Sequence, residues 1–79
     1  MKNMYLKYFV AIKNRPEIVI IVPVPSHDSS ISDEEYAKYR RDHEIIRIRD
    51  SITDGQSFRI ENRIFNPEAI DYVIVNTME

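Results

Sequence analysis

The sequence lacks cysteine altogether and contains a single glycine among its 79 residues. Without cysteine, neither disulfides nor a cysteine-based metal cluster can form, and the composition fits a reducing compartment better than secretion. The apolar run from Ile18 to Val22 is far too short to span a bilayer. Lysines at positions 2, 7 and 13 interrupt any signal-peptide core. We therefore expect a soluble protein of the cytoplasm.

Neither sign of charge is in strong excess. The formal net charge is -2, and 30% of the residues are charged. This balance argues against both a polybasic nucleic-acid binder and a strongly acidic DNA mimic. A hydrophobic content of 43% with one glycine also argues against disorder. The length then predicts one small domain over residues 1–79.

Catalytic motifs are equally scarce. Because Gly55 is the one glycine, no phosphate-binding loop, dinucleotide fingerprint or nucleophile elbow can be built. The serines are explained as turn, cap or strand residues, and a chain this short has little room for a deep ligand pocket. We expect no enzyme activity, no catalytic residues and no cofactor.

The first third of the chain predicts a β-hairpin over residues 4–24. Apolar and polar side chains alternate from Met4 to Lys13, which is typical of a strand. One face of this strand carries Tyr5, Phe9 and Ala11, a set too apolar for a solvated edge. We therefore expect either the helix or a second copy of the protein to cover it. The following run, Glu17 to Val24, is apolar on both faces and indicates a central or doubly covered strand.

A helix is predicted at residues 33–43, after a loop at 25–32. Ser32 has the character of an N-cap, and Glu35 follows at the capping-box spacing. The predicted apolar face of this helix is thin and consists mainly of Tyr36 and Tyr39.

The second half predicts a three-stranded β-meander over residues 44–77. If the loop between its first two strands is Thr53 to Gly55, one face collects the apolar residues Ile46, Ile48, Ile52, Phe58 and Ile60. A two-residue turn at Asp54 and Gly55 would mix polar and apolar residues on both faces, so we favour the three-residue loop. The last strand, rich in β-branched residues, should again be well covered. The fold class is α+β: a small, mainly antiparallel five-stranded sheet or partly curled barrel with one helix, in the order β-β-α-β-β-β.

Both histidines and six carboxylates lie between Ser26 and Glu44, which raises the question of a metal site. His43 is placed at the end of the predicted helix, about 15 Å along the helix axis from its start. His27 lies in the loop before that helix, and the spacing of the two histidines matches no compact zinc pattern. We predict no metal site and expect a partly buried, hydrogen-bonded His43.

Arginines are the strongest candidates for a binding site. Arg47, Arg49 and Arg59, with Arg63, are predicted to project from the outer face of one hairpin, where arginine suits the recognition of carboxylate or phosphate. Compensation within the domain, by Glu61, Asp50 or the acidic helix turn, is the alternative explanation. The full set of predicted partner-binding residues is Arg47, Arg49, Arg59, Arg63, Tyr36, Tyr39 and Arg40.

These features favour a non-catalytic protein-interaction module that acts as a regulator, adaptor or inhibitor of a partner protein. The composition is also typical of phage or mobile-element accessory proteins, some of which inhibit a host system in the host cytoplasm. The alternative is a small nucleic-acid-binding, barrel-like protein that uses the arginine-bearing hairpin face. We expect it less, because no aromatic residue interleaves with those arginines. A homodimer through the face of Tyr5, Phe9 and Ala11 is a further expectation.

Overall fold

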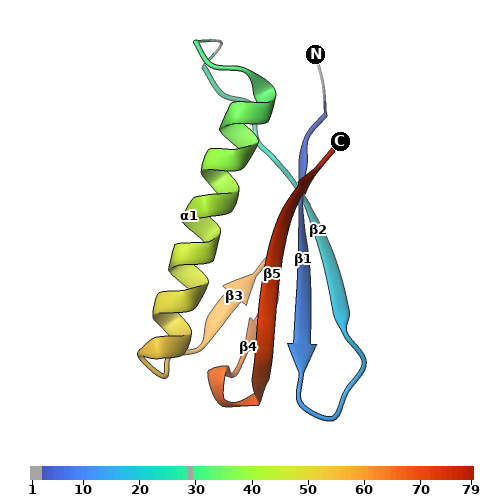
Figure 1. The fold of residues 1–79 in the computed structure, drawn as a ribbon, viewed down its shortest axis with the longest axis vertical. Helices are drawn as coiled ribbons and strands as arrows, with labels where there is room; N and C mark the ends of the chain where they lie inside the picture. The colour runs from blue at the N-terminus through green and yellow to red at the C-terminus, as the bar shows by residue number, and fades with distance from the viewer. Residues whose placement is uncertain (1–2, 29) are drawn as a thin grey trace.

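The computed structural model describes residues 3–28 and 30–79 of the chain. The described residues form one α-helix and five strands in the predicted order, which confirms the α+β class (Figure 1). The elements are β1 (Tyr5–Ile12), β2 (Ile18–Pro23), α1 (Asp33–Thr53), β3 (Phe58–Ile60), β4 (Arg63–Phe65), the single 3-10 turn η1 (Pro67–Ala69) and β5 (Ile70–Met78).

The strands form two separate antiparallel sheets and do not close into a barrel. One sheet has the order β2-β1-β5, and the other is the short hairpin β3-β4. The predicted hairpin over residues 4–24 is confirmed, with Leu6 opposite Val22 and Val10 opposite Ile18. β1 therefore lies in the centre, and β2 and β5 are both edge strands. The prediction that the strand of Glu17 to Val24 is central or doubly covered is wrong. The last strand is predicted to be well covered, but β5 is an edge strand with exposed residues on one side.

The predicted end of the helix at residue 43 is also wrong. α1 continues to Thr53, so the segment 44–52 is helical and is not the first strand of a meander. A short apolar run fits a strand or a buried helix equally well, and tertiary packing decides between them. Here Ile48 and Ile52 are four residues apart, on one side of the helix, and both pack into the core. The predicted three-stranded meander is therefore wrong: β3 and β4 pair as a hairpin of their own, β5 pairs with β1, and the five strands divide into two sheets.

Gly55 ends this helix and does not form a hairpin loop. Its φ of 69° lies in the left-handed region that glycine adopts without strain. The Gln56 N–H donates to the Ser51 carbonyl at 2.8 Å, and the Gly55 N–H donates to the Ile52 carbonyl at 3.1 Å. This pair of bonds is the Schellman arrangement of a helix C-terminus. At the other end the predicted N-cap is confirmed, because Ser32 Oγ accepts the Glu35 N–H at 3.1 Å.

The core lies between the three-stranded sheet on one side and α1 with the β3-β4 hairpin on the other. The sheet contributes Leu6, Tyr8 and Val10 of β1, which are 3%, 2% and 0% exposed. α1 contributes Ile48 from the opposite layer, and the hairpin contributes residues such as Ile60. Within the described residues, no helix combines the length and apolar character needed to cross a membrane.

Candidate functional site

The candidate site is the side of the three-stranded sheet that points away from α1, which we call the outer face. Successive side chains of a strand point to opposite sides of a sheet, so the residues that alternate with the core positions of β1 must lie here. The outer face consists of Tyr5, Lys7, Phe9 and Ala11 of β1, Val19 and Ile21 of β2, and Tyr72, Ile74 and Asn76 of β5.

The strand register joins these side chains into one apolar patch. Phe9 is at its centre, directly opposite Val19 on one neighbouring strand and Ile74 on the other. In the next row, Lys7 lies between Ile21 and Asn76. Directly opposed side chains in antiparallel strands are close enough to touch, so the patch is continuous across all three strands.

The outer face is exposed to a degree that is unusual for its composition. Val19 is 48% exposed, Ile21 50%, and Tyr72 and Ile74 47% each. Among the described residues, α1 and the β3-β4 hairpin both pack against the opposite side of the sheet (Figure 1). Contiguous apolar patches of this kind mark interaction surfaces more often than isolated exposed residues do.

Two polar contacts lie on the outer face, one near its middle and one at its margin. The Lys7 ammonium lies 5.1 Å from the centre of the Phe9 ring, a cation–π distance. The Tyr72 hydroxyl donates to Glu17 Oε2 at 2.7 Å, and this hydrogen bond raises the pKa of Tyr72 above its usual value. The outer face therefore offers a cation near its middle and a carboxylate at its margin.

The predicted arginine site is not assembled in the structure. Arg47 and Arg49 lie on α1, while Arg59 and Arg63 lie on β3 and β4. Within the hairpin Arg59 opposes Ile64, and Arg63 opposes the buried Ile60, so the two arginines are on different sides of its pleat. The prediction that four arginines project from one hairpin face is wrong.

Arg47 is held inside the domain by a polar network. Its guanidinium donates to both carboxylate oxygens of Glu44, at 2.7 and 2.8 Å, and to the Arg59 carbonyl at 2.8 Å. The Tyr8 hydroxyl also donates to Glu44 Oε1 at 2.7 Å. These bonds tie α1 to the sheet and to the hairpin, so Arg47 has a structural partner of its own.

The titration of this network follows from its geometry. The hydrogen bond from Arg47 lowers the pKa of the Glu44 carboxyl, against the opposing effect of burial. Burial, followed by the hydrogen bond to Glu44, raises the pKa of Tyr8. At neutral pH the carboxylate is therefore ionised and the phenol is neutral, which is the arrangement that the hydrogen bonds require.

The two predicted tyrosines belong to a row of rings along α1. His27 stacks on Tyr36 with the ring centres 4.2 Å apart and an angle of 10° between the planes. Tyr39 follows at 6.3 Å from Tyr36, and His43 at 6.4 Å from Tyr39. Tyr39 is 64% exposed, and His43 is also exposed, so the prediction of a partly buried His43 is wrong. The exposed Arg40 is the next residue after Tyr39 on the helix.

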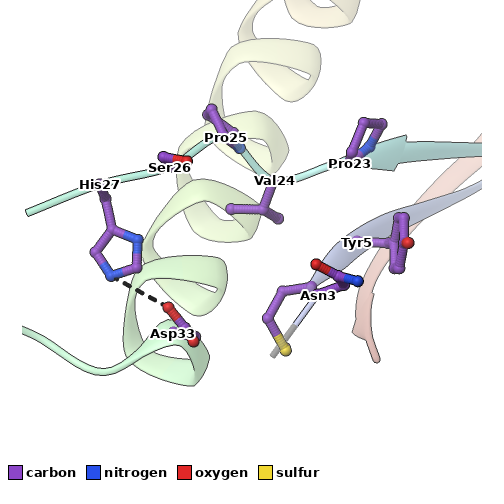
Figure 2. Close-up of a pocket in the computed structure, with 9 residues that line it drawn as sticks. Asn3, Tyr5, Pro23, Val24, Pro25, Ser26, His27 and Asp33 are labelled. Atoms are coloured by element: carbon purple, nitrogen blue, oxygen red, sulfur yellow. Dashed lines mark ion pairs between the residues drawn. The ribbon is translucent and has the colours of Figure 1, made fainter. Parts of the chain in front are cut away.

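A small hollow of about 130 Å³ lies where the sheet meets the start of α1. Figure 2 shows His27 and Asp33 on one side of it, facing Asn3 and Tyr5 on the other. His27 Nε2 is 3.7 Å from Asp33 Oδ1 and 3.2 Å from the Ile31 carbonyl. In the part of the chain that the structure describes, no three acidic or histidine side chains are grouped so as to hold a metal ion. The hollow is also smaller than the sites that enclose small-molecule ligands.

The sequence indicates only part of the outer face. Its alternation identifies Tyr5, Phe9 and Ala11 as an apolar face that needs a cover. Val19 and Ile74 are missed, because an apolar pattern on both sides of a strand is typical of a central strand. In this protein the strands that are apolar on both sides, β2 and β5, are edge strands, and one of their apolar sides is uncovered. Comparisons of the chain with models of protein families, with curated proteins and with solved structures find no match, so the proposals rest on the physical character of these surfaces.

Proposed function

We propose that this protein is a non-catalytic interaction module that binds a partner protein through the outer face. The observation that carries the proposal is the half-exposed cluster of Val19, Ile21, Tyr72 and Ile74 around Phe9. Burying such side chains releases free energy of about 25 cal/mol per Å² of apolar surface, which is the main driving force of most protein association. A module of this kind acts by occupying a partner's surface, as a regulator, adaptor or inhibitor.

The dimensions of the outer face suit the centre of an interface. Seven residues of β1 span roughly 24 Å, and three strands with their side chains span roughly 15 Å, which gives an area of about 350 Å². Specific interfaces bury about 800 Å² on each partner. The outer face therefore supplies the apolar centre, and the partner must also contact the surrounding rim.

The composition of the outer face fits the same role. Aromatic side chains are enriched at the centres of interfaces, and Tyr5, Phe9 and Tyr72 supply them here. Lys7 and Glu17 add one charge of each sign, so the partner surface should be apolar with a carboxylate placed to reach Lys7. A contribution from Tyr39 and Arg40, which lie on the helix, stays a prediction.

Nucleic-acid binding is the second candidate function. Lys7 lies between Tyr5 and Phe9 on the same face of β1, and a cation between aromatic rings is the pattern that stacks single-stranded bases. Against it, Lys7 is the one cation among the described residues of the outer face, and Glu17 lies at its margin. The chain as a whole also has a net charge of -2. Protein binding is therefore the better supported function.

Site-specific photo-cross-linking in the cells that produce the protein tests this proposal. A benzophenone amino acid replaces Ile74 on the outer face, and the control carries it at Lys38, an exposed position on α1. We expect polypeptide adducts from position 74 and none from position 38. Equal adducts from both positions, or none from either, would contradict the proposal.

The same experiment separates the alternatives. The mass of the adduct distinguishes a second copy of the chain, as a homodimer through Tyr5, Phe9 and Ala11 requires, from a different protein. A fluorescently labelled oligothymidine measured by anisotropy at low and high salt tests the nucleic-acid candidate. Salt-sensitive binding that is lost in Phe9→Ala would favour that candidate over protein binding.

A further inference from the structure

A second apolar surface lies between α1 and β5, away from the outer face. It is a groove of about 300 Å³, lined by Ile45, Ile48, Arg49, Ile52, Thr53, Val73 and Val75. The lining residues come from α1 and from the edge strand β5, which pack on each other and lie next to each other in Figure 1. We propose that this groove and the edge of β5 together bind an extended segment of a partner protein, which joins the sheet as an added strand.

The edge of β5 has the properties that strand addition requires. β5 is nine residues long, and within the described residues no other strand pairs with its outer side. Native edge strands are usually shortened, or protected by proline, β-bulges or lysine. β5 contains neither proline nor lysine and carries a single charge, at Asp71. Its register with β1 shifts at Asp71, between Ile70 and Tyr72, so the segment from Tyr72 to Met78 is a regular strand. The opposite edge, β2, has six residues and ends at Pro23, so it is the protected edge.

The groove has the length and lining to receive the side chains of such a segment. A strand paired with β5 would lie about 4.8 Å from it and point every second side chain toward α1. Two such side chains are about 7 Å apart. Ile45 and Ile52, at the two ends of the helical wall, are about 10 Å apart by the helical rise. The groove therefore accommodates two successive aliphatic side chains, with Val73 and Val75 contributed by the strand.

The charge at the groove indicates a further feature of the ligand. Arg49 lines the groove, and its side chain is 67% exposed. Its Nε is 3.7 Å from Asp50 Oδ1, a long contact between two exposed groups that contributes little. A carboxylate on the bound segment would meet Arg49 at closer range. The ligand is thus an extended peptide with aliphatic residues at alternate positions and an acidic residue beside them.

A second copy of this chain does not fit the same groove. α1 packs mainly on β5 and only slightly on β1, so the helix lies over the edge strand. Pairing β5 with the β5 of another copy would bring the two helices toward one strand spacing, about 4.8 Å, whereas packed helices need 8–10 Å. An extended segment without its own helix avoids this clash. The binding mode is strand addition next to a helix, as in peptide-recognition domains.

Selection from a displayed library of random heptapeptides against the intact protein tests the proposal. We expect enriched peptides with alternating aliphatic residues and an acidic residue. On binding the best of them, the amide hydrogens of β5 should exchange more slowly with solvent. No enrichment, or enrichment of peptides without this alternation, would overturn the proposal.

Matched variants then locate the bound peptide. Ile45 and Ile46 are adjacent and exposed to 40% and 49%, but only Ile45 lines the groove. We expect Ile45→Glu to weaken binding at least tenfold and Ile46→Glu to change it less than twofold. Arg49→Glu changes an exposed side chain, and it should weaken binding several-fold and more strongly at low salt. Equal losses in Ile45→Glu and Ile46→Glu would exclude the groove.

The proposal for the groove and the proposal for the outer face can be refuted independently. Ile21→Glu alters the outer face on β2, so it should leave peptide binding in the groove unchanged. A concentration-dependent dimer in light scattering that Ile45→Glu abolishes and Ile46→Glu does not would show that a second copy occupies the groove, which contradicts the assignment.

Discussion

The two sides of the three-stranded sheet have similar residues and opposite surroundings. On the inner side Leu6, Tyr8 and Val10 are at most 3% exposed, under the helix and the hairpin. On the outer side, apolar residues of the two neighbouring strands, such as Ile21 and Ile74, remain about half exposed. The difference shows that apolar character alone does not identify the core of this protein. The cover provided by α1 and β3-β4 decides which side stabilises the fold and which side is left to bind.

Truncation of apolar side chains on the two sides should separate these roles. We expect Leu6→Ala to lower the free energy of unfolding by about 2–5 kcal/mol, because it leaves a cavity in the core. Ile21→Ala, at a position that is 50% exposed, should cost about 1 kcal/mol by the smaller area it uncovers. Urea unfolding followed by circular dichroism measures both. Similar costs for the two variants would mean that the outer face is packed within the protein.

Removal of the polar tie between sheet and helix should have the next largest effect. Tyr8→Phe deletes the 2.7 Å hydrogen bond to Glu44 and keeps the ring in the core. A hydrogen bond to a charged group is worth about 1.5–3 kcal/mol, so we expect a loss of stability in that range by urea unfolding. If the loss is negligible, the network does not hold α1 on the inner side.

The same network makes stability depend on pH in a defined direction. The pKa of Glu44 is lowered in the folded state, so its contribution is present above the pKa of the unfolded chain and is lost as the pH falls through the folded pKa. The pKa of Tyr8 is raised, so its contribution is complete below about 10 and is lost at higher pH. We expect Glu44→Gln to flatten the acid limb of a stability profile measured between pH 3 and 7. An unchanged acid limb would assign the dependence to other carboxyl groups.

A change at Gly55, where α1 ends, should have a smaller effect on stability. Gly55 has a φ of 69°, and no atom lies within 4 Å of the position that a side-chain carbon would occupy. Gly55→Ala therefore meets no steric clash, and we expect a cost of about 1–2 kcal/mol from the left-handed backbone alone. Gly55→Asn should cost less, since asparagine tolerates this conformation better. Equal stability of the alanine variant and the native protein would show that the cap does not depend on glycine.

The sequence predicts the parts of this fold that local patterns determine. The alternation in β1, the hairpin that follows it and the Ser32 cap are all confirmed. The extent of α1 is not predicted, because residues 44–52 alternate like a strand and also place Ile48 and Ile52 on one helical face. Packing of that face against the sheet decides in favour of the helix, and this packing cannot be predicted from the local sequence.

The same limit applies to the candidate sites. The face of Tyr5, Phe9 and Ala11 is recognised from its alternation, but its extension over Val19 and Ile74 depends on the strand order. The predicted arginine face depended on a hairpin between residues 44 and 65, and it is lost once Arg47 and Arg49 lie on the helix. The groove beside β5 depends on a helix and a strand that are far apart in the chain, so no sequence pattern reports it.

The most direct test of the division between the two sides is the affinity of the photo-captured partner for Ile21→Glu. Lys7 lies directly opposite residue 21, so a glutamate there gains a favourable cross-strand neighbour and the fold should be retained, as circular dichroism can verify. We predict at least a tenfold loss of affinity, because a charge replaces an apolar contact within the outer face. Unchanged affinity in a folded variant would contradict the assignment of the outer face as the binding surface.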